Sequence, residues 1–194
     1  MSFVLGLALP NKIIIKSDGR VISGDSTSIL TENYNKTRRI SNKLIAGFSG
    51  NRSLCELIFN TFLESFRIQS ISDDADIAIR SLRDIAMQIS KKHPNIPCSF
   101  LIGGFNSLGV TTLNSFELLK PNDITYNQVT IDSIAITALE PPELKGQGTS
   151  IYKKSLALSG NFIDAMDITI TEVASKSFSV NTVIFEQVIH PLTE

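Results

Sequence analysis

The second residue of the chain is a serine whose position gives it two reactive groups at once. Enzymes that remove the initiator methionine accept a small residue after Met1, so we expect Ser2 to become the N-terminus. A hydroxyl and an α-amine would then lie on one residue. An N-terminal amine with a pKa near ~7.7–8 is substantially neutral around that pH and can take the proton of its own hydroxyl. Ser2 is therefore a candidate nucleophile and general base together.

Cysteine, histidine and metal chemistry are poorly supported. Cys55 and Cys98 are the only cysteines and both lie in apolar stretches. We expect buried free thiols of a reducing compartment, with a disulfide or metal site as the open alternative. His93 and His190 each precede a proline at the expected end of an element, which argues against a histidine-centred or zinc site. We expect no cofactor and no metal.

Length and composition indicate one globular domain over residues 1–194. Apolar residues make up 42% of the chain and charged residues 19%, and the net charge is −1. No basic stripe is evident, so nucleic acid is not an expected partner. The first apolar run, 3–9, is about seven residues long. A membrane span needs ~20, and no signal peptide is evident, so we expect a cytoplasmic protein without a membrane segment.

Short apolar runs separated by turn residues predict strands. The first two, 3–9 and 12–17, flank Pro10-Asn11 and are expected to form a buried hairpin. After a polar stretch, a further pair is expected around Asn42. In the second half of the chain the expected strands are 98–105 and 109–116, turning at Asn106-Ser107, then 129–137 and 182–188.

Apolar residues at helical spacing predict two pairs of helices. The first pair consists of one helix with an apolar stripe from Leu54 to Phe66, and a second that has Asp73-Asp74 in its first turn and stops at Pro94. In the second pair, one helix spans 149–158 and a final helix begins at the capping-box sequence Thr169-Ile170-Thr171-Glu172. The order is strands, two helices, strands, two helices, strand. It favours two antiparallel sheets packed on each other and covered outside by helix pairs.

Several motifs in order along the chain resemble a known family. Asp18-Gly19-Arg20 lies sixteen residues after Ser2, and Lys36 is followed by Ile45-Ala46-Gly47-Phe48-Ser49-Gly50 before the first helix. This set resembles the proteasome β-type subunits. The stretch 36–50 is most similar to the bacterial ATP-dependent peptidase of the same family, and the likeness extends to 97–105 and to the Gly146–Gly148 turn.

That resemblance implies an α+β fold of four layers, αββα, and an N-terminal-nucleophile hydrolase. Family members assemble into rings that enclose their active sites, and their nucleophile is normally a threonine exposed by processing. The implied substrates are peptides or unfolded proteins, and an ATP-dependent unfoldase is a possible partner. The implied assembly is a ring of identical subunits.

The family's catalytic positions fall on five residues of this chain. Ser2 falls on the nucleophile, Asp18 and Arg20 on the aspartate and its companion arginine, and Lys36 on the lysine beside the nucleophile. Gly50 falls on the glycine whose amide serves the oxyanion. Lys36, held by Asp18, would lower the proton affinity of the Ser2 hydroxyl and amine. An amide at the oxyanion contributes roughly 2.7–4 kcal/mol in other hydrolases.

The implied substrate pocket is restricted. Phe48 occupies the position of its floor, with Val21 and Arg52 nearby by analogy. Serine in place of threonine keeps the hydroxyl but lacks the γ-methyl that restricts the side-chain rotamer, so a slower nucleophile is expected.

Two family positions differ. The supporting serine of the glycine-flanked turn falls on Gln147, and the family's late aspartate and serine have no clear match, although Ser177 or Ser179 could substitute. Two alternatives therefore stay open beside the peptidase. One is a non-catalytic subunit of a ring, and the other is an amidase acting on a small molecule with the same fold.

Overall fold

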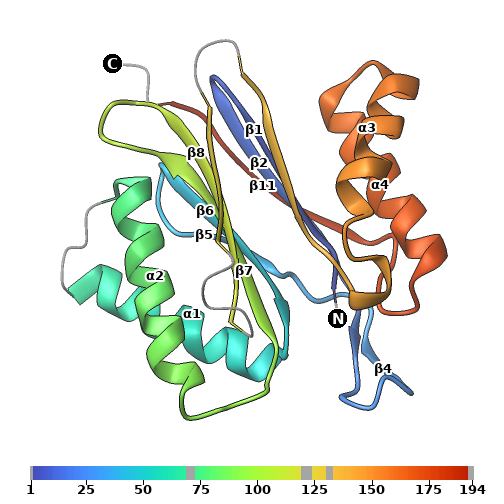
Figure 1. Ribbon diagram of the computed structural model, residues 1–194, viewed down its shortest axis with the longest axis horizontal. Coiled ribbons are helices and arrows are strands. Elements are labelled where there is room, and N and C mark those ends of the chain that lie inside the picture. Colours follow the sequence, from blue (N-terminus) through green and yellow to red (C-terminus); the bar gives the residue numbers. More distant parts are fainter. Residues whose placement is uncertain (1, 69–72, 119–123, 130–132, 192–194) are drawn as a thin grey trace.

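The strands of the computed structural model, which describes residues 2–68, 73–118, 124–129 and 133–191, form two stacked sheets with a pair of helices outside each (Figure 1). The first sheet has the strand order β10-β1-β2-β11 and the second the order β5-β6-β7-β8-β9, and all pairs are antiparallel. The strands are β1 (Val4–Leu9), β2 (Lys12–Asp18), β3 (Val21–Ile22), β4 (Ile29–Thr31), β5 (Thr37–Arg39), β6 (Leu44–Gly50), β7 (Cys98–Phe105), β8 (Thr111–Glu117), β9 (Ile124–Val129), β10 (Ala135–Leu139) and β11 (Ile184–Ile189).

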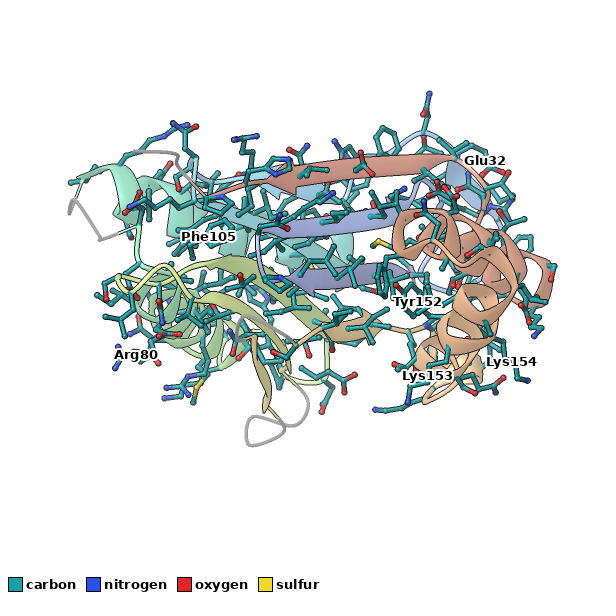
Figure 2. The ribbon with its side chains drawn as sticks, turned by 90° about the horizontal axis from the view of Figure 1, so that it is seen from above. Glu32, Arg80, Phe105, Tyr152, Lys153 and Lys154 are labelled. Carbon is teal, nitrogen blue, oxygen red and sulfur yellow. The ribbon has the colours of Figure 1, made fainter. Side chains whose placement is uncertain are left out.

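Two helices cover the outer face of each sheet. The five-stranded sheet carries α1 (Arg52–Ile68) and α2 (Ala75–Ser90), and the four-stranded sheet carries α3 (Gly148–Ser159) and α4 (Phe162–Lys176). A short 3-10 helix, η1 (Pro142–Leu144), leads into α3. In Figure 2, Tyr152 of α3 turns toward the strands while Lys153 and Lys154 project outward, as their burial and exposure require. The expected four-layer αββα fold is confirmed.

Three apolar cores hold the layers together, one between each sheet and its helices and one between the sheets. Strand β1 is buried on both faces: Leu5 and Leu7 pack toward α3 and α4, while Val4 and Ala8 pack between the sheets. A strand covered on both faces needs apolar residues at consecutive positions. This explains why 3–9 is a continuous apolar run rather than an alternating one.

The helix starts follow their capping residues. The helix expected with Asp73-Asp74 in its first turn is present as α2, but it begins just after them: the Asp74 carboxylate caps it by accepting from the amides of Asp76 and Ile77. The final helix starts earlier than expected: Asn161 caps it, and Thr169 lies in its buried middle. The Thr169 hydroxyl donates to the Ala165 carbonyl 2.6 Å away instead of capping an amide, so the capping-box interpretation is wrong.

Two further expectations differ from the structure. The single strand expected over 129–137 is two strands in different sheets, because β9 ends at Val129 and β10 begins at Ala135, with 130–132 outside the described residues. The polar stretch after residue 22 contains β4, which pairs with β3 as a separate two-stranded hairpin. Its short alternation gives no strand signal of its own.

The start of β1 and the end of β6 meet at one end of the sandwich, where the β3–β4 hairpin also lies (Figure 1). Glu32 is at this end of the molecule, and Phe105 is at the other (Figure 2). The fold therefore brings Ser2, at the start of the chain, next to residues near position 50.

The two sheets pack so closely at Gly47 that a substitution there tests the distance between them. A Cβ added to Gly47 would lie 2.6 Å from Val4 Cγ1 and 3.1 Å from Ile15 Cγ2, both in the closed core. We expect Gly47→Ala to lower the free energy of unfolding by about 1–3 kcal/mol, since the added atom overpacks this core. Chemical denaturation measures the change.

Gly24→Ala is the matched control, because nothing lies within 4 Å of the added atom. The double variant Gly47→Ala with Val4→Ala should be less destabilised than the sum of the two single changes, since Val4→Ala removes the clashing methyl. Strict additivity would contradict this account of the packing.

Candidate active site

Ser2 is held at the mouth of the sandwich by hydrogen bonds on both sides. Its backbone nitrogen donates to Ser49 Oγ at 3.2 Å, and Ser49 Oγ donates to the Ser2 carbonyl at 2.9 Å. The next amide, Phe3 N, donates to Asp18 Oδ1 at 2.8 Å. Ser2 is 7% exposed and lines a pocket. Its backbone is therefore fixed by β2 and β6 together.

Asp18 is a fully buried carboxylate with three donors around it. Oδ1 accepts from Phe3 N, and Oδ2 accepts from Arg20 N at 2.8 Å. Lys36 Nζ lies 2.8 Å from Oδ2. A buried carboxylate needs such partners to offset its lost hydration. Asp18 thus connects the segment that leads from Ser2 into β1 with Lys36, the residue just before β5.

Lys36 is a buried ammonium facing the pocket. Burial lowers its pKa below the usual range, and the nearby Arg20 guanidinium adds to that effect, while the Asp18 carboxylate opposes it. The contact with Asp18 is not aligned as a hydrogen bond, and no acceptor in the described part of the chain takes a hydrogen from Nζ. Lys36 Nζ is therefore buried, paired with Asp18 and part of the lining of the pocket that Ser2 also lines.

Gly50 adopts a backbone conformation that other residues rarely reach. Its φ is +118°, and a Cβ there would lie 2.3 Å from the Pro97 carbonyl oxygen. Two residues later α1 begins, and Asn51 N donates to the same Pro97 oxygen at 2.8 Å. The turn from β6 into α1 therefore requires glycine, and it places the Gly50 backbone on the pocket wall.

The pocket has a volume of about 460 Å³ and contains every residue the sequence placed in it. Phe48 is buried against the core below α1 and forms part of the floor, while Val21 and Arg52 line the walls. Leu30 of the β3–β4 hairpin forms an exposed rim. Ser2, Lys36, Ser49 and Gly50 line the same pocket.

One wall of the pocket is a network that the sequence did not indicate. Arg52 stacks 4.3 Å from the centroid of the Tyr34 ring and pairs with Glu56 at 3.4 Å. The Tyr34 hydroxyl donates to the Glu56 carboxylate, and Arg38 lies over the rings of Tyr34 and Phe48. On this wall the Glu56 carboxylate is paired with Arg52, while Arg38 donates to the backbone carbonyls of Asn35 and Thr37.

Arg20 acts at a distance from the pocket. Its guanidinium binds the Glu32 carboxylate at 2.9 and 3.0 Å and the Phe178 carbonyl at 2.7 Å, and only its backbone amide reaches Asp18. Asn181 accepts from Gly19 N and donates to Glu32. Arg20 thus ties the β3–β4 hairpin and the segment before β11 to the loop after Asp18.

The candidates for the missing family groups have other partners. Gln147 is exposed and makes no side-chain cap for α3, although it occupies the cap position. Ser177 and Ser179 are buried, bonded to each other at 2.9 Å, and Ser177 donates to Glu143. Within the described ranges, neither serine hydrogen-bonds to Ser2. Ser49, the residue that does, gave no signal in the sequence beyond its place beside Gly50.

The described part of the chain holds neither a disulfide nor a group of residues that could bind a metal ion. Cys55 and Cys98 are buried free thiols, as expected, and the Cys98 contact and burial raise the pKa of the Cys55 thiol far above its usual range. Among residues 2–68, 73–118, 124–129 and 133–191, no group of three or more histidines, cysteines or carboxylates could hold a metal ion. None of the helices described is both long and apolar enough to cross a membrane.

Comparison with protein families decides the assignment. The model described as "Proteasome subunit" matches residues 2–118, which include Ser2, Asp18, Lys36 and Gly50. The chain belongs to the proteasome subunit family. A search of curated proteins gives no match.

Solved structures with this proteasome-type fold are similar over almost the whole chain. The Anbu complex from Pseudomonas aeruginosa, described as a helical assembly, has a TM-score of 0.75 at 16% identity, covering 97% of this chain and 81% of that one. HslV from Trypanosoma brucei has a TM-score of 0.61 at 12% identity, with 97% and 99% covered. An Anbu mutant from Hyphomicrobium sp. strain MC1 has a TM-score of 0.72 at 14% identity, with 98% and 82% covered. At these identities the likeness shows the fold.

Asp18→Asn tests the central ion pair. The amide has nearly the same shape but carries no charge, so the buried Lys36 ammonium loses its partner and the new NH₂ group meets donors. We expect a loss of about 3–5 kcal/mol in unfolding free energy, measured by chemical denaturation. Asp84→Asn, at an exposed position in the middle of α2, is the control and should change stability by less than about 0.5 kcal/mol. Equal stability of the two variants would contradict the role given to Asp18.

Tyr34 supplies a test at high pH. Burial and the hydrogen bond to Glu56 raise the pKa of Tyr34 from 10.0 to about 12. Because the folded pKa exceeds the unfolded one, the contribution to stability is complete below about pH 10 and lost as pH rises through 12. Burial also raises the pKa of Tyr152 to about 12, so the tyrosinate absorbance that develops near pH 12 should lose the amplitude of one phenol in Tyr34→Phe. The same phenol titrating near 10 would overturn this description.

Proposed function

We propose that the chain is a peptidase in which Ser2, freed by removal of Met1, is the nucleophile. The observation that carries the proposal is that Ser2, Lys36 and Gly50 line one pocket and that Asp18 joins Lys36 to the Phe3 amide, the residue next to Ser2. In this proposal Asp18 and Lys36 are the pair that lowers the proton affinity of the Ser2 hydroxyl and amine. Arg20 positions the loop that follows Asp18. The proposed substrates are peptides or unfolded proteins.

In the first step, Ser2 Oγ attacks the carbonyl carbon of a peptide bond and its proton passes to the neutral amine of the same residue. The Lys36 ammonium, 2.8 Å from Asp18 and short of acceptors, stabilises the developing alkoxide. The oxygen of the tetrahedral intermediate receives a hydrogen bond from the Gly50 amide, whose unusual backbone conformation sets its direction.

The protonated amine then gives its proton to the leaving nitrogen, the peptide bond breaks and an acyl ester forms on Ser2 Oγ. Water, deprotonated by the same amine, attacks that ester, and the proton returns to Oγ as the acid product leaves. No cofactor enters this sequence.

The pocket beside Ser2 is proposed to receive the side chain that precedes the cleaved bond. Phe48 closes its floor, and Val21 gives an apolar wall. Arg52 is already paired with Glu56 and stacked on Tyr34. An uncharged side chain of moderate size therefore fits this pocket better than a charged one.

We further propose that residues 1–194 act as one domain in a ring of identical subunits in the cytoplasm, with an ATP-dependent unfoldase as a possible partner. Membership of the proteasome subunit family supports an assembly of many copies. The similar Anbu chain belongs to a complex described as a helical assembly.

A non-catalytic subunit of the same assembly is the second candidate. Gln147 has no hydroxyl to offer, and Ser177 and Ser179 are occupied by Glu143 and each other. A subunit of this kind would form the same particle without reacting with electrophiles aimed at N-terminal nucleophiles.

Ser2→Ala tests the proposed nucleophile. We expect it to lower kcat on a fluorogenic peptide by at least about 10³-fold and to abolish adduct formation with a peptide epoxyketone or vinyl sulfone, because the attacking hydroxyl is gone. The control is Ser99→Ala, a serine of β7 that lies opposite Ser49 and outside the pocket. It should keep its activity.

Intact mass of the native protein completes the test. The proposal requires a chain that begins at Ser2 and gains the mass of one probe. A native chain that keeps Met1, or an assembled particle that begins at Ser2 and forms no adduct, would replace the peptidase with the non-catalytic subunit.

A further inference from the structure

The Ser49 hydroxyl makes two hydrogen bonds among the described residues, and both join it to the backbone of Ser2. Its Oγ accepts from Ser2 N at 3.2 Å and donates to the Ser2 carbonyl at 2.9 Å. Ser49 is 3% exposed and lies near the end of β6, facing the other sheet. A buried hydroxyl that bonds to both the nitrogen and the carbonyl of one residue restricts the orientation of that residue's backbone.

The geometry points to Ser49 as the residue that positions the Ser2 amine, and we propose this role for it. The inference rests on the proposed function of Ser2. Once Met1 is removed, the nitrogen that donates to Ser49 Oγ becomes the α-amine, and the contact at 3.2 Å is already in place. No step of the mechanism above assigned a group to hold this amine.

The direction of the two hydrogen bonds decides how the amine is presented. A serine hydroxyl has one hydrogen, and Ser49 gives it to the Ser2 carbonyl. Ser49 can therefore only accept from the Ser2 nitrogen. One N–H of the amine is thereby fixed on Ser49, so the nitrogen lone pair is left for the proton of the Ser2 hydroxyl.

The other polar groups at this end of the sandwich have different partners. Ser177 and Ser179 hydrogen-bond to each other and Ser177 donates to Glu143, while Gln147 is exposed; neither serine hydrogen-bonds to Ser2 in the described part of the chain. Ser49, by contrast, precedes Gly50 directly in the chain. The amine and the proposed oxyanion donor are thus held by consecutive residues of one strand.

The test uses chains that begin at Ser2, verified by intact mass, in three variants: Ser49→Ala, Ser49→Thr and the control Ser99→Ala. Ser99 is the cross-strand partner of Ser49, so its substitution removes the same group from the same sheet without touching Ser2. Peptide turnover is measured across pH, and the rate of Ser2 amine acetylation by acetic anhydride is measured by mass spectrometry.

We expect Ser49→Ala to lower kcat about tenfold or more with KM nearly unchanged, because the amine loses its fixed orientation. The acid limb of the pH–rate profile should move to lower pH, since an acceptor for the protonated amine is gone. Acetylation of Ser2 should become several-fold faster. Ser49→Thr, which keeps a hydroxyl, should restore kcat to within about threefold, and Ser99→Ala should match the wild type.

Equal losses in Ser49→Ala and Ser49→Thr would overturn the proposal, because packing rather than the hydroxyl would then be responsible. So would a Ser49→Ala chain with wild-type kcat, pH profile and acetylation rate. If the wild-type chain shows no turnover and no probe adduct, the peptidase proposal fails. Faster acetylation in Ser49→Ala would even then establish that Ser49 holds the amine.

Discussion

The buried carboxylate of Asp18 is the interaction on which the site depends. It accepts from the Phe3 and Arg20 amides and pairs with the Lys36 ammonium while fully buried, so none of the three partners can be removed without leaving an unmatched charge or donor. The same contacts that stabilise the fold therefore also hold Lys36 beside the segment that carries Ser2, the proposed nucleophile. Stability and chemistry share one group here, and a change that disturbs one disturbs the other.

Much of the fold could be predicted from local patterns. The continuous apolar run 3–9 indicated a strand covered on both faces, and Asp74 marked a helix start by a mechanism that acts within three residues. Lys36 and Gly50 were predicted as site residues from the order of motifs along the chain, and both line the same pocket as Ser2. Features that depend on neighbours in the sequence are readable from the sequence.

The remainder depends on contacts between distant segments. Nothing near Ser49 says that its hydroxyl meets residue 2, and nothing near Asn181 says that it bonds to Gly19 and Glu32. The Thr169 capping signal failed for a related reason: the segment before it is buried against the sheet, and Asn161 offered an earlier cap. The pocket wall of Tyr34, Arg52 and Glu56 also forms only when the segment between β4 and β5 packs against α1.

The β3–β4 hairpin has only two strands, and such a unit has little stability of its own. Its order comes from outside the pocket, through Glu32, which Arg20 and Asn181 hold against the segment before β11. These contacts of Glu32 already restrict the motion of the hairpin, so a substrate of the proposed pocket would not have to order it on binding. Loss of the Glu32 contacts would make the hairpin more mobile and so weaken binding of such a substrate, although no residue that lines the pocket would have changed.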